Sequence, residues 1–95
     1  MKRYAVRIPP EVEAFVRHLH PRLKKTIRHA LEALEENPYL GKPLTEQLRG
    51  FFSLRASHYR IIYRIKAREV LIEVVDIAER KIVYQKISSL LKKLH

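Results

Sequence analysis

The chain has 95 residues, of which 46% are hydrophobic and 32% charged, so we expect residues 1–95 to form a single globular domain. Cysteine is absent, which excludes disulfides, thiolate catalysis and zinc–sulfur sites. With 20 Lys and Arg against 10 Asp and Glu, the net charge of +10 favours nucleic acid, an anionic membrane surface or an acidic protein as the partner.

The beginning of the chain predicts a strand and two helices. Apolar side chains alternate with others over residues 2–8, which indicates a half-buried strand. Pro10 suits the first position of a helix, and His20-Pro21 ends that helix and begins another. The second helix has its own apolar stripe and is expected to end before Asn37-Pro38.

Residues 38–50 predict a loop, because Gly and Pro interrupt the pattern there. A loop of this length inside a compact domain needs anchoring, so we expect Leu40, Leu44 and Leu48 to pack on the core. The loop leads into a hairpin that carries three arginines.

The hairpin is predicted over residues 48–65 with its turn at Ser57-His58, so that Arg55 lies opposite Arg60. Alternation then places one set of side chains on an apolar face: Phe52, Leu54, Ala56, Tyr59, Ile61 and Tyr63. The other face carries Arg55, Arg60 and Arg64. Like charges directly opposite each other destabilise a sheet, so this cluster predicts a site for an anion.

The end of the chain predicts one more strand and a helix. Residues 66–69 form a second turn, and residues 70–77 form an apolar strand in which Val70 lies opposite Ile65. In this register the core face gains Val70, Ile72 and Val74. Residues 80–94 predict an amphipathic helix with the apolar stripe Val83, Ile87, Leu90, Leu91 and Leu94.

These elements predict an α+β fold: an N-terminal strand, a two-helix hairpin, a three-stranded antiparallel meander and a C-terminal helix, with the helices on one face of the sheet. No apolar run reaches the ~20 residues of a membrane span, and the first residues lack the apolar block of a signal peptide. We therefore expect a cytoplasmic protein outside the membrane. The histidines are scattered, so no metal or other cofactor is expected.

The residues around the hairpin suit an RNA phosphate. Arginine forks such as those of Arg55 and Arg60 match a phosphate, Arg80 follows the last strand, and Tyr84 comes one helical turn later. A tyrosine can stack a base or exchange a proton, which suits transesterification within an RNA strand. The alternative is that Tyr84 packs on the sheet and the arginines are surface residues. His58 is either an ordinary turn residue or a general acid or base.

Several short motifs carry a resemblance to a known family. They are Gly41-Lys42-Pro43-Leu44, Leu48-Arg49-Gly50, Leu54-Arg55, Tyr59-Arg60-Ile61-Ile62-Tyr63, and Arg80 with Val83-Tyr84. Together they resemble the RelE/ParE superfamily of type II toxins over nearly the whole chain. The resemblance implies the same fold and a hetero-oligomer with an acidic antitoxin. It also implies metal-free cleavage of messenger RNA on the ribosome, in which a 2′-hydroxyl attacks the adjacent phosphate.

The resemblance also implies roles for particular residues. Arg60 and Arg80 would stabilise the scissile phosphate, and Tyr84 would stack the nucleotide or help to activate the 2′-hydroxyl. Further RNA contacts are expected from Arg55, Lys42, Arg64 and His58.

The chain departs from RelE at two positions, because Phe51 and Ser53 stand where RelE has lysines. The residue that donates a proton to the leaving 5′-oxygen is therefore undecided, and the candidates are His58, Lys42 and Lys66. Two other functions also stay open. One is inhibition of DNA gyrase, as by a ParE toxin, and the other is a weakly active homologue that serves as an antitoxin-binding module.

Overall fold

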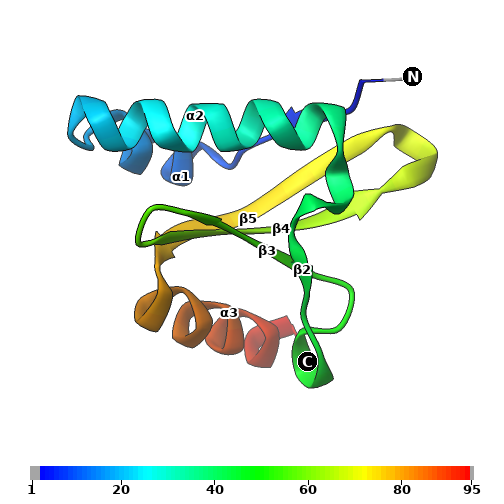
Figure 1. The fold of residues 1–95 in the computed structure, drawn as a ribbon. Helices are drawn as coiled ribbons and strands as arrows, with labels where there is room; N and C mark the ends of the chain where they lie inside the picture. Colours follow the sequence, from blue (N-terminus) through cyan, green and yellow to red (C-terminus); the bar gives the residue numbers. More distant parts are fainter. Residues whose placement is uncertain (1–2, 95) are drawn as a thin grey trace.

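A mixed five-stranded sheet separates two layers of helices (Figure 1). The computed structural model describes residues 3–94, except for the side chains of residues 88 and 90–94. The strand order across the sheet is β1-β5-β4-β3-β2, with β1 parallel to β5 and the other neighbours antiparallel. The strands are β1 (Ala5–Arg7), β2 (Lys42–Pro43), β3 (Phe52–Ala56), β4 (Tyr59–Lys66) and β5 (Leu71–Glu79).

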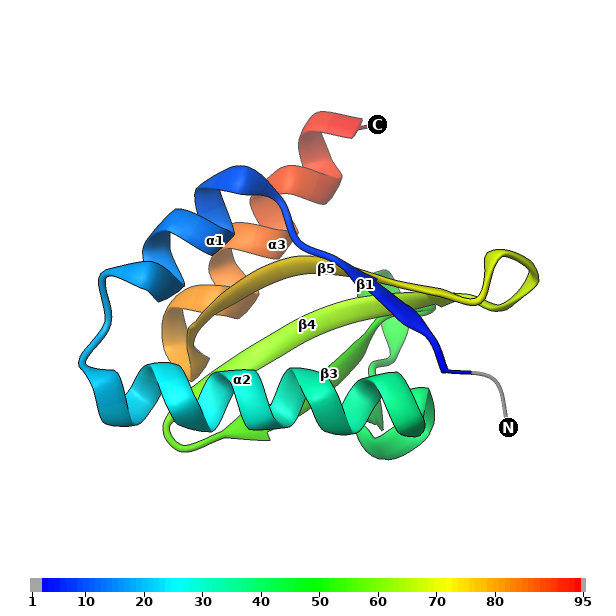
Figure 2. The ribbon, with the colours of Figure 1, turned by 90° about the horizontal axis from the view of Figure 1, so that it is seen from above.

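The helices lie on both faces of this sheet. The α1 (Pro10–Arg17) and α2 (Pro21–Glu36) helices cover one face, and α3 (Arg80–Leu94) covers the other (Figure 1). Seen from above, α2 lies over β3 and α1 lies toward β5 (Figure 2). The predicted α+β order of elements is confirmed, but the prediction that all helices share one face is wrong. An apolar stripe shows which side of a helix is buried, and it does not show which face of the sheet that side covers.

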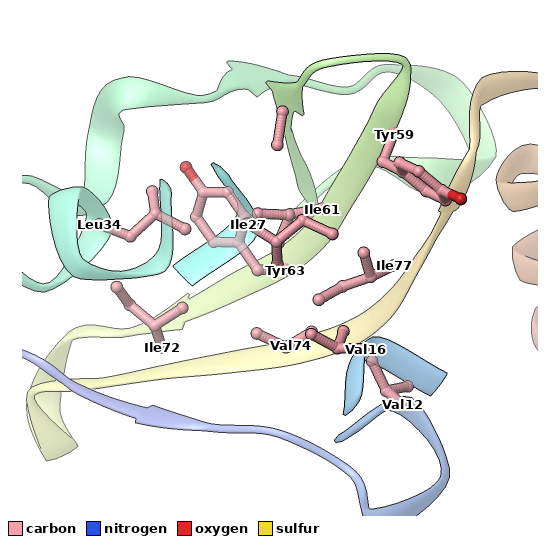
Figure 3. Packing of buried hydrophobic residues seen from close by; sticks show 11 residues of the cluster. Val12, Val16, Ile27, Leu34, Tyr59, Ile61, Tyr63, Ile72, Val74 and Ile77 are labelled. Atoms are coloured by element: carbon pink, nitrogen blue, oxygen red, sulfur yellow. The ribbon is translucent and has the colours of Figure 1, made fainter. Parts of the chain in front are cut away.

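The larger core lies between the sheet and the α1–α2 layer (Figure 3). Ile27 and Leu34 of α2 and Ile61 and Tyr63 of β4 are completely buried there. All six residues of the predicted apolar hairpin face belong to this core or pack against it. The alternation that the sequence predicts for the hairpin is therefore confirmed.

A smaller core lies on the α3 side of the sheet. Val83 and Ile87 of the predicted helical stripe are buried there, while the rest of that stripe (Leu90, Leu91 and Leu94) lies outside the described side chains. The partly buried residues that pack against this core are Leu44, Leu48, Phe51, Val75 and Tyr84. Two of the three predicted loop anchors are thus correct. The third is wrong, because Leu40 is 49% exposed.

The hairpin between β3 and β4 has the predicted register. Ala56 pairs with Tyr59 and Arg55 with Arg60 around a turn at Ser57-His58. Ser57 has a φ of 59°, in the left-handed region that tight hairpin turns use.

The register between β4 and β5 differs from the predicted one. Ile65 pairs with Ile72 and not with Val70. The chain turns through the short 3₁₀ helix η3 (Ala67–Glu69), and Val70 takes a left-handed conformation with a φ of 50° before β5 begins. The turn therefore spans residues 67–70, one residue later than the predicted 66–69, and Val70 belongs to it.

A β-bulge changes the register again in the middle of β5. Tyr63 pairs with Val74, whereas the preceding residue of β4, Ile62, pairs with Asp76. Val75 is therefore an extra residue on β5. Six of the nine residues of β5 are apolar and lie on both faces of the strand, so its sequence has no alternation that would reveal the bulge.

Tyr63 ties the loop before β2 to the core. Its hydroxyl donates a hydrogen bond to Pro38 O at 2.7 Å and accepts one from Gly41 N at 3.0 Å. Burial raises the pKa of the Tyr63 hydroxyl, against the opposing effect of the Gly41 hydrogen bond. A Cβ atom at Gly41 would lie 2.5 Å from Tyr63 Oη, so glycine permits the close approach.

Replacing Tyr63 with phenylalanine is expected to lower the free energy of unfolding by ~1–3 kcal/mol, because two buried backbone groups lose their partner. Tyr39→Phe is the matched control, since the Tyr39 side chain is largely exposed. Urea denaturation measures both variants. Equal losses in the two would show that the Tyr63 hydroxyl does not anchor the loop.

Candidate functional site

The α3 side of the sheet carries the predicted catalytic residues close together. Arg55 of β3 lies directly opposite Arg60 of β4, and Arg60 pairs in turn with Ala78 of β5. Arg80 begins α3 two residues beyond Ala78, and Tyr84 lies one helical turn later on the same helix face. We call the following residues the candidate site: Lys42, Arg55, Arg60, Arg80 and Tyr84.

The two opposed arginines use little of their hydrogen-bonding capacity. Arg55 Nε donates to Ser57 O at 3.1 Å, and Arg60 Nη1 donates to Tyr59 O at 3.3 Å. A guanidinium group has several N–H donors in a planar fork. Most of these donors on Arg55 and Arg60 have no partner among the described residues, so they can contact a phosphate.

Among the described residues, no carboxylate forms an ion pair with the candidate site. The ion pairs among the described side chains use other cations: Arg3, Arg7, Arg17, Arg64, Lys66 and Lys86. Within the part of the chain that the structure describes, no Asp or Glu lies within 4.0 Å of the charged atoms of the candidate site. Like charges directly opposite in a sheet are destabilising, so the site favours binding of an anion.

Tyr84 is held against the sheet by a hydrogen bond and by packing. Its hydroxyl donates to Ser53 Oγ of β3 at 3.3 Å, and its ring packs on the smaller core. Ser53 is buried, so this contact fixes where the tyrosine hydroxyl lies. The lone pairs of Tyr84 Oη can still accept a hydrogen bond from a ligand hydroxyl.

Lys42 lies opposite the same serine on the edge strand of the sheet. It pairs with Ser53 across β2 and β3, and paired residues of antiparallel strands present their side chains on one face about 5 Å apart. Lys42 is exposed. Ser53 therefore lies between Lys42 on the neighbouring strand and Tyr84 on α3.

Two of the predicted RNA contacts have other interactions in the structure. Arg64 is four residues along β4 from the arginine pair, ~13 Å at ~3.3 Å per residue. Its Nε donates to Glu73 Oε1 at 2.5 Å. His58 lies in the hairpin turn, where its ring packs against that of Tyr59 with 4.5 Å between centroids. The charge of Arg64 is thus already paired, and the His58 ring has a packing role.

Glu73 is the centre of a separate ion-pair network. Its carboxylate lies 2.5 Å from Arg64, 3.5 Å from Arg7 and 3.7 Å from Lys66. The hydrogen bond from Arg64, aided by the charges of all three cations, holds the pKa of Glu73 below its ordinary 4.5, although burial opposes this shift.

The lowered pKa of Glu73 makes stability depend on pH at the acid end. The unfolded chain protonates this carboxyl near pH 4.5, while the folded protein keeps it ionised to lower pH. The free energy of unfolding is therefore expected to decrease as the pH falls below 4.5 and through the folded pKa of Glu73. Glu73→Gln should reduce this dependence in urea denaturation more than Glu13→Gln, which removes an exposed helical pair. Equal pH dependence in both variants would contradict the assignment.

The sequence identifies Phe51 and Ser53 only as positions without lysine, and the structure gives each a contact. Phe51 packs on the smaller core, and Ser53 binds the Tyr84 hydroxyl. The pairing of Lys42 with Ser53 has no sequence signal, because β2 has only two residues and shows no alternation.

Other classes of site are not found in the described residues. No group of three or more His, Cys, Asp or Glu side chains there is arranged to hold a metal ion. None of the described helices is long and apolar enough to cross a membrane.

Comparison with known families identifies the chain. The model of a family described as the ParE toxin of type II toxin–antitoxin system, parDE, matches residues 6–84. The chain belongs to this toxin family. The matched residues include the whole candidate site.

Relatives of this toxin come from the same superfamily. The toxin RelG of Mycobacterium tuberculosis is 31% identical over 85 residues, which is 87% of this chain and 98% of RelG. The toxin RelE of the same organism is 40% identical over 53 residues, or 55% of each chain.

Solved structures agree with the fold. The toxin–antitoxin complex RelBE2 of M. tuberculosis contains a chain that matches with a TM-score of 0.72 and 30% identity, covering 82% of this toxin and 99% of that chain. A mutant of the E. coli toxin RelE in the free state matches with a TM-score of 0.73, covering 98% and 99% of the two chains. At 17% identity, the E. coli structure supports the fold alone.

Proposed function

We propose that this toxin is a ribosome-dependent endoribonuclease that cleaves messenger RNA and so inhibits translation, with residues 1–95 as one toxin domain. The observation that carries this proposal is the opposed Arg55–Arg60 pair, which has no carboxylate partner among the described residues. The Tyr84 hydroxyl is hydrogen-bonded to Ser53, two residues before Arg55 on β3. Its relatives include toxins named RelE and RelG, whose superfamily it resembles in the motifs of the hairpin and of α3.

The proposed reaction is a transesterification within the RNA strand. The 2′-hydroxyl oxygen attacks the adjacent phosphorus, and the bond from phosphorus to the 5′-oxygen breaks. The products are a 2′,3′-cyclic phosphate and a new 5′-hydroxyl end. Because RNA supplies its own nucleophile, the protein needs only to position the strand, stabilise charge and move protons.

The candidate site offers groups for each of these tasks. Negative charge grows on the non-bridging oxygens during the attack, and the forks of Arg60 and Arg80 suit that charge. Arg55 adds a third guanidinium for binding the strand. Tyr84 Oη, with its proton directed to Ser53, accepts a hydrogen bond from the 2′-hydroxyl and orients it for attack.

An acidic antitoxin is the partner that suits this surface. The charge of +10 attracts a segment rich in Asp and Glu, and such a segment can fold on binding. Carboxylates placed against Arg55 and Arg60 would occupy the donors that the phosphate needs. Co-expression of the antitoxin is therefore expected to abolish toxicity by covering the candidate site.

Inhibition of DNA gyrase is the second candidate function. It is favoured by the ParE description of the matching family and by Phe51 and Ser53, which replace the RelE lysines. A gyrase inhibitor would not need Arg60, Arg80 and Tyr84 together. The candidate site therefore favours RNA cleavage.

Purified toxin tests the two functions side by side. We expect it to cut a message bound to translating ribosomes, to leave the same message intact without ribosomes, and to leave gyrase supercoiling unchanged. Cleavage of naked RNA would contradict ribosome dependence. Loss of supercoiling activity with an intact message would favour the gyrase function.

A further inference from the structure

We propose that Lys42 is the general acid of the RNA cleavage reaction, which donates a proton to the departing 5′-oxygen. The inference rests on the proposed function and adds a catalytic residue to it. The reaction needs such a group, because the 5′-oxygen would otherwise leave as an alkoxide, a strong base. The strand positions at which RelE has lysines hold Phe51 and Ser53 here, and neither side chain is an acid at neutral pH.

The sheet register places Lys42 next to Ser53, the position at which RelE has a lysine and this chain has an uncharged side chain. Lys42 lies opposite Ser53 on the neighbouring strand, and the two side chains share the α3 face of the sheet. The Tyr84 hydroxyl reaches the same serine at 3.3 Å. The four-carbon stem of lysine spans the distance from its own strand to the space above Ser53, so its ammonium group and the Tyr84 hydroxyl can face the same phosphodiester.

The backbone around Lys42 is fixed on both sides. Gly41 N, immediately before it, donates to the buried Tyr63 hydroxyl at 3.0 Å. Leu44 N, two residues after it, donates to Phe51 O at 2.9 Å. Lys42 therefore projects from an anchored two-residue strand, which suits a group that must meet one substrate atom.

The other candidate acids are less suitable in this structure. The Lys66 ammonium lies 3.7 Å from Glu73 and 3.9 Å from Glu69, at the far end of β4 from the turn. The His58 ring packs on Tyr59 in the hairpin turn. Arginine side chains hold their protons too tightly to donate them. In the described part of the chain, Lys42 has no carboxylate within 4.0 Å that would retain its ammonium group.

The proton and electron balance of the step is simple. As the bond from phosphorus to the 5′-oxygen breaks, its electron pair stays on oxygen, and a proton moves from Lys42 Nζ to that oxygen. The products are a 5′-hydroxyl group and a neutral amine, which regains a proton from water. The proton of the attacking 2′-hydroxyl passes to solvent.

A substrate with sulfur in place of the bridging 5′-oxygen tests this assignment. A thiolate, with a pKa of ~8.5 for its thiol, leaves without a proton, so the general acid becomes unnecessary. The assay uses synthetic messages with oxygen or sulfur at the cut position, bound to ribosomes. Lys42→Ala is expected to slow cleavage of the oxygen message by ~10²-fold and to leave cleavage of the sulfur message within a few-fold of wild type.

Two further variants complete the test. Lys42→Arg keeps the positive charge but cannot donate its proton, so we expect it to be as slow as Lys42→Ala on the oxygen message. Lys25→Ala removes one charge from the exposed face of α2 and should cut both messages normally. Equal losses on oxygen and sulfur, or full activity of Lys42→Ala on oxygen, would overturn the general-acid role while wild-type cleavage upholds the proposed function. A wild-type toxin that cuts neither message would overturn the proposed function and this role with it.

Discussion

Replacement of Arg60 with alanine is expected to reduce cleavage of ribosome-bound message by ~10²–10³-fold, the usual loss when one preorganised donor to a developing oxyanion is removed. Arg60 is half-buried beside the exposed Arg55, and its guanidinium makes a single hydrogen bond, to Tyr59 O, among the described residues. The side chain therefore has free N–H donors for the phosphate and contributes few contacts to the fold. In cells, induction of the variant should no longer arrest growth.

The control for Arg60→Ala is Arg28→Ala. Arg28 is exposed on α2, on the opposite face of the sheet, and its loss changes the net charge by the same amount. We expect this variant to cleave RNA like the wild type and both variants to unfold at similar urea concentrations. Equal loss of cleavage in the two would mean that net charge alone explains the effect.

Replacement of Tyr84 with phenylalanine is expected to slow cleavage by ~10²-fold, because small misplacement of a reacting group has effects of that size. The ring and its packing on the smaller core are kept, and only the hydroxyl that contacts Ser53 is lost. If Tyr84 orients the 2′-hydroxyl, the cleavage rate of Tyr84→Phe should fall strongly. If Tyr84 only stacks on a base, the cleavage rate should not change.

The partner of that hydroxyl provides a graded comparison. Ser53→Ala frees the Tyr84 hydroxyl without removing it, so we expect a smaller loss than in Tyr84→Phe. Single-turnover rates on ribosome-bound message measure both variants. Wild-type rates for Tyr84→Phe would exclude a hydroxyl role and leave base stacking as its contribution.

The hairpin shows how far local pattern can predict structure. Its turn at Ser57-His58, its strand pairs and its two faces follow from alternation, because every second residue is apolar within each strand, over residues 52–56 and again over residues 59–63. The opposed arginines of the candidate site are therefore visible in the sequence alone.

The register between β4 and β5 shows the limit of the same reasoning. Where a strand is apolar on both faces, a shift in register leaves the pattern unchanged. The left-handed Val70 and the extra residue Val75 both alter the register of β5, and neither residue type signals it. The sheet has apolar residues on both faces, so the sequence does not show which face α3 covers.

The contacts that complete the candidate site join segments far apart in the chain. Tyr84 and Ser53 are separated by 31 residues, and Gly41 and Tyr63 by 22. The periodicity of a single strand or helix does not relate such distant positions. Only the folded structure reveals that Ser53 lies between Lys42 on β2 and Tyr84 on α3. The likeness to RelE-type toxins predicts roles for Arg60, Arg80 and Tyr84, and the sheet register shows that Lys42 lies opposite Ser53, the partner of the Tyr84 hydroxyl.

The most direct test of RNA cleavage at the candidate site is mapping of RNA 5′ ends in cells after induction. The wild-type toxin is expected to produce new 5′-hydroxyl ends within translated messages, and Arg60→Ala, expressed to the same level, is expected to produce none. Growth arrest with intact messages would contradict RNA cleavage, and new ends that persist in Arg60→Ala would contradict the assigned site.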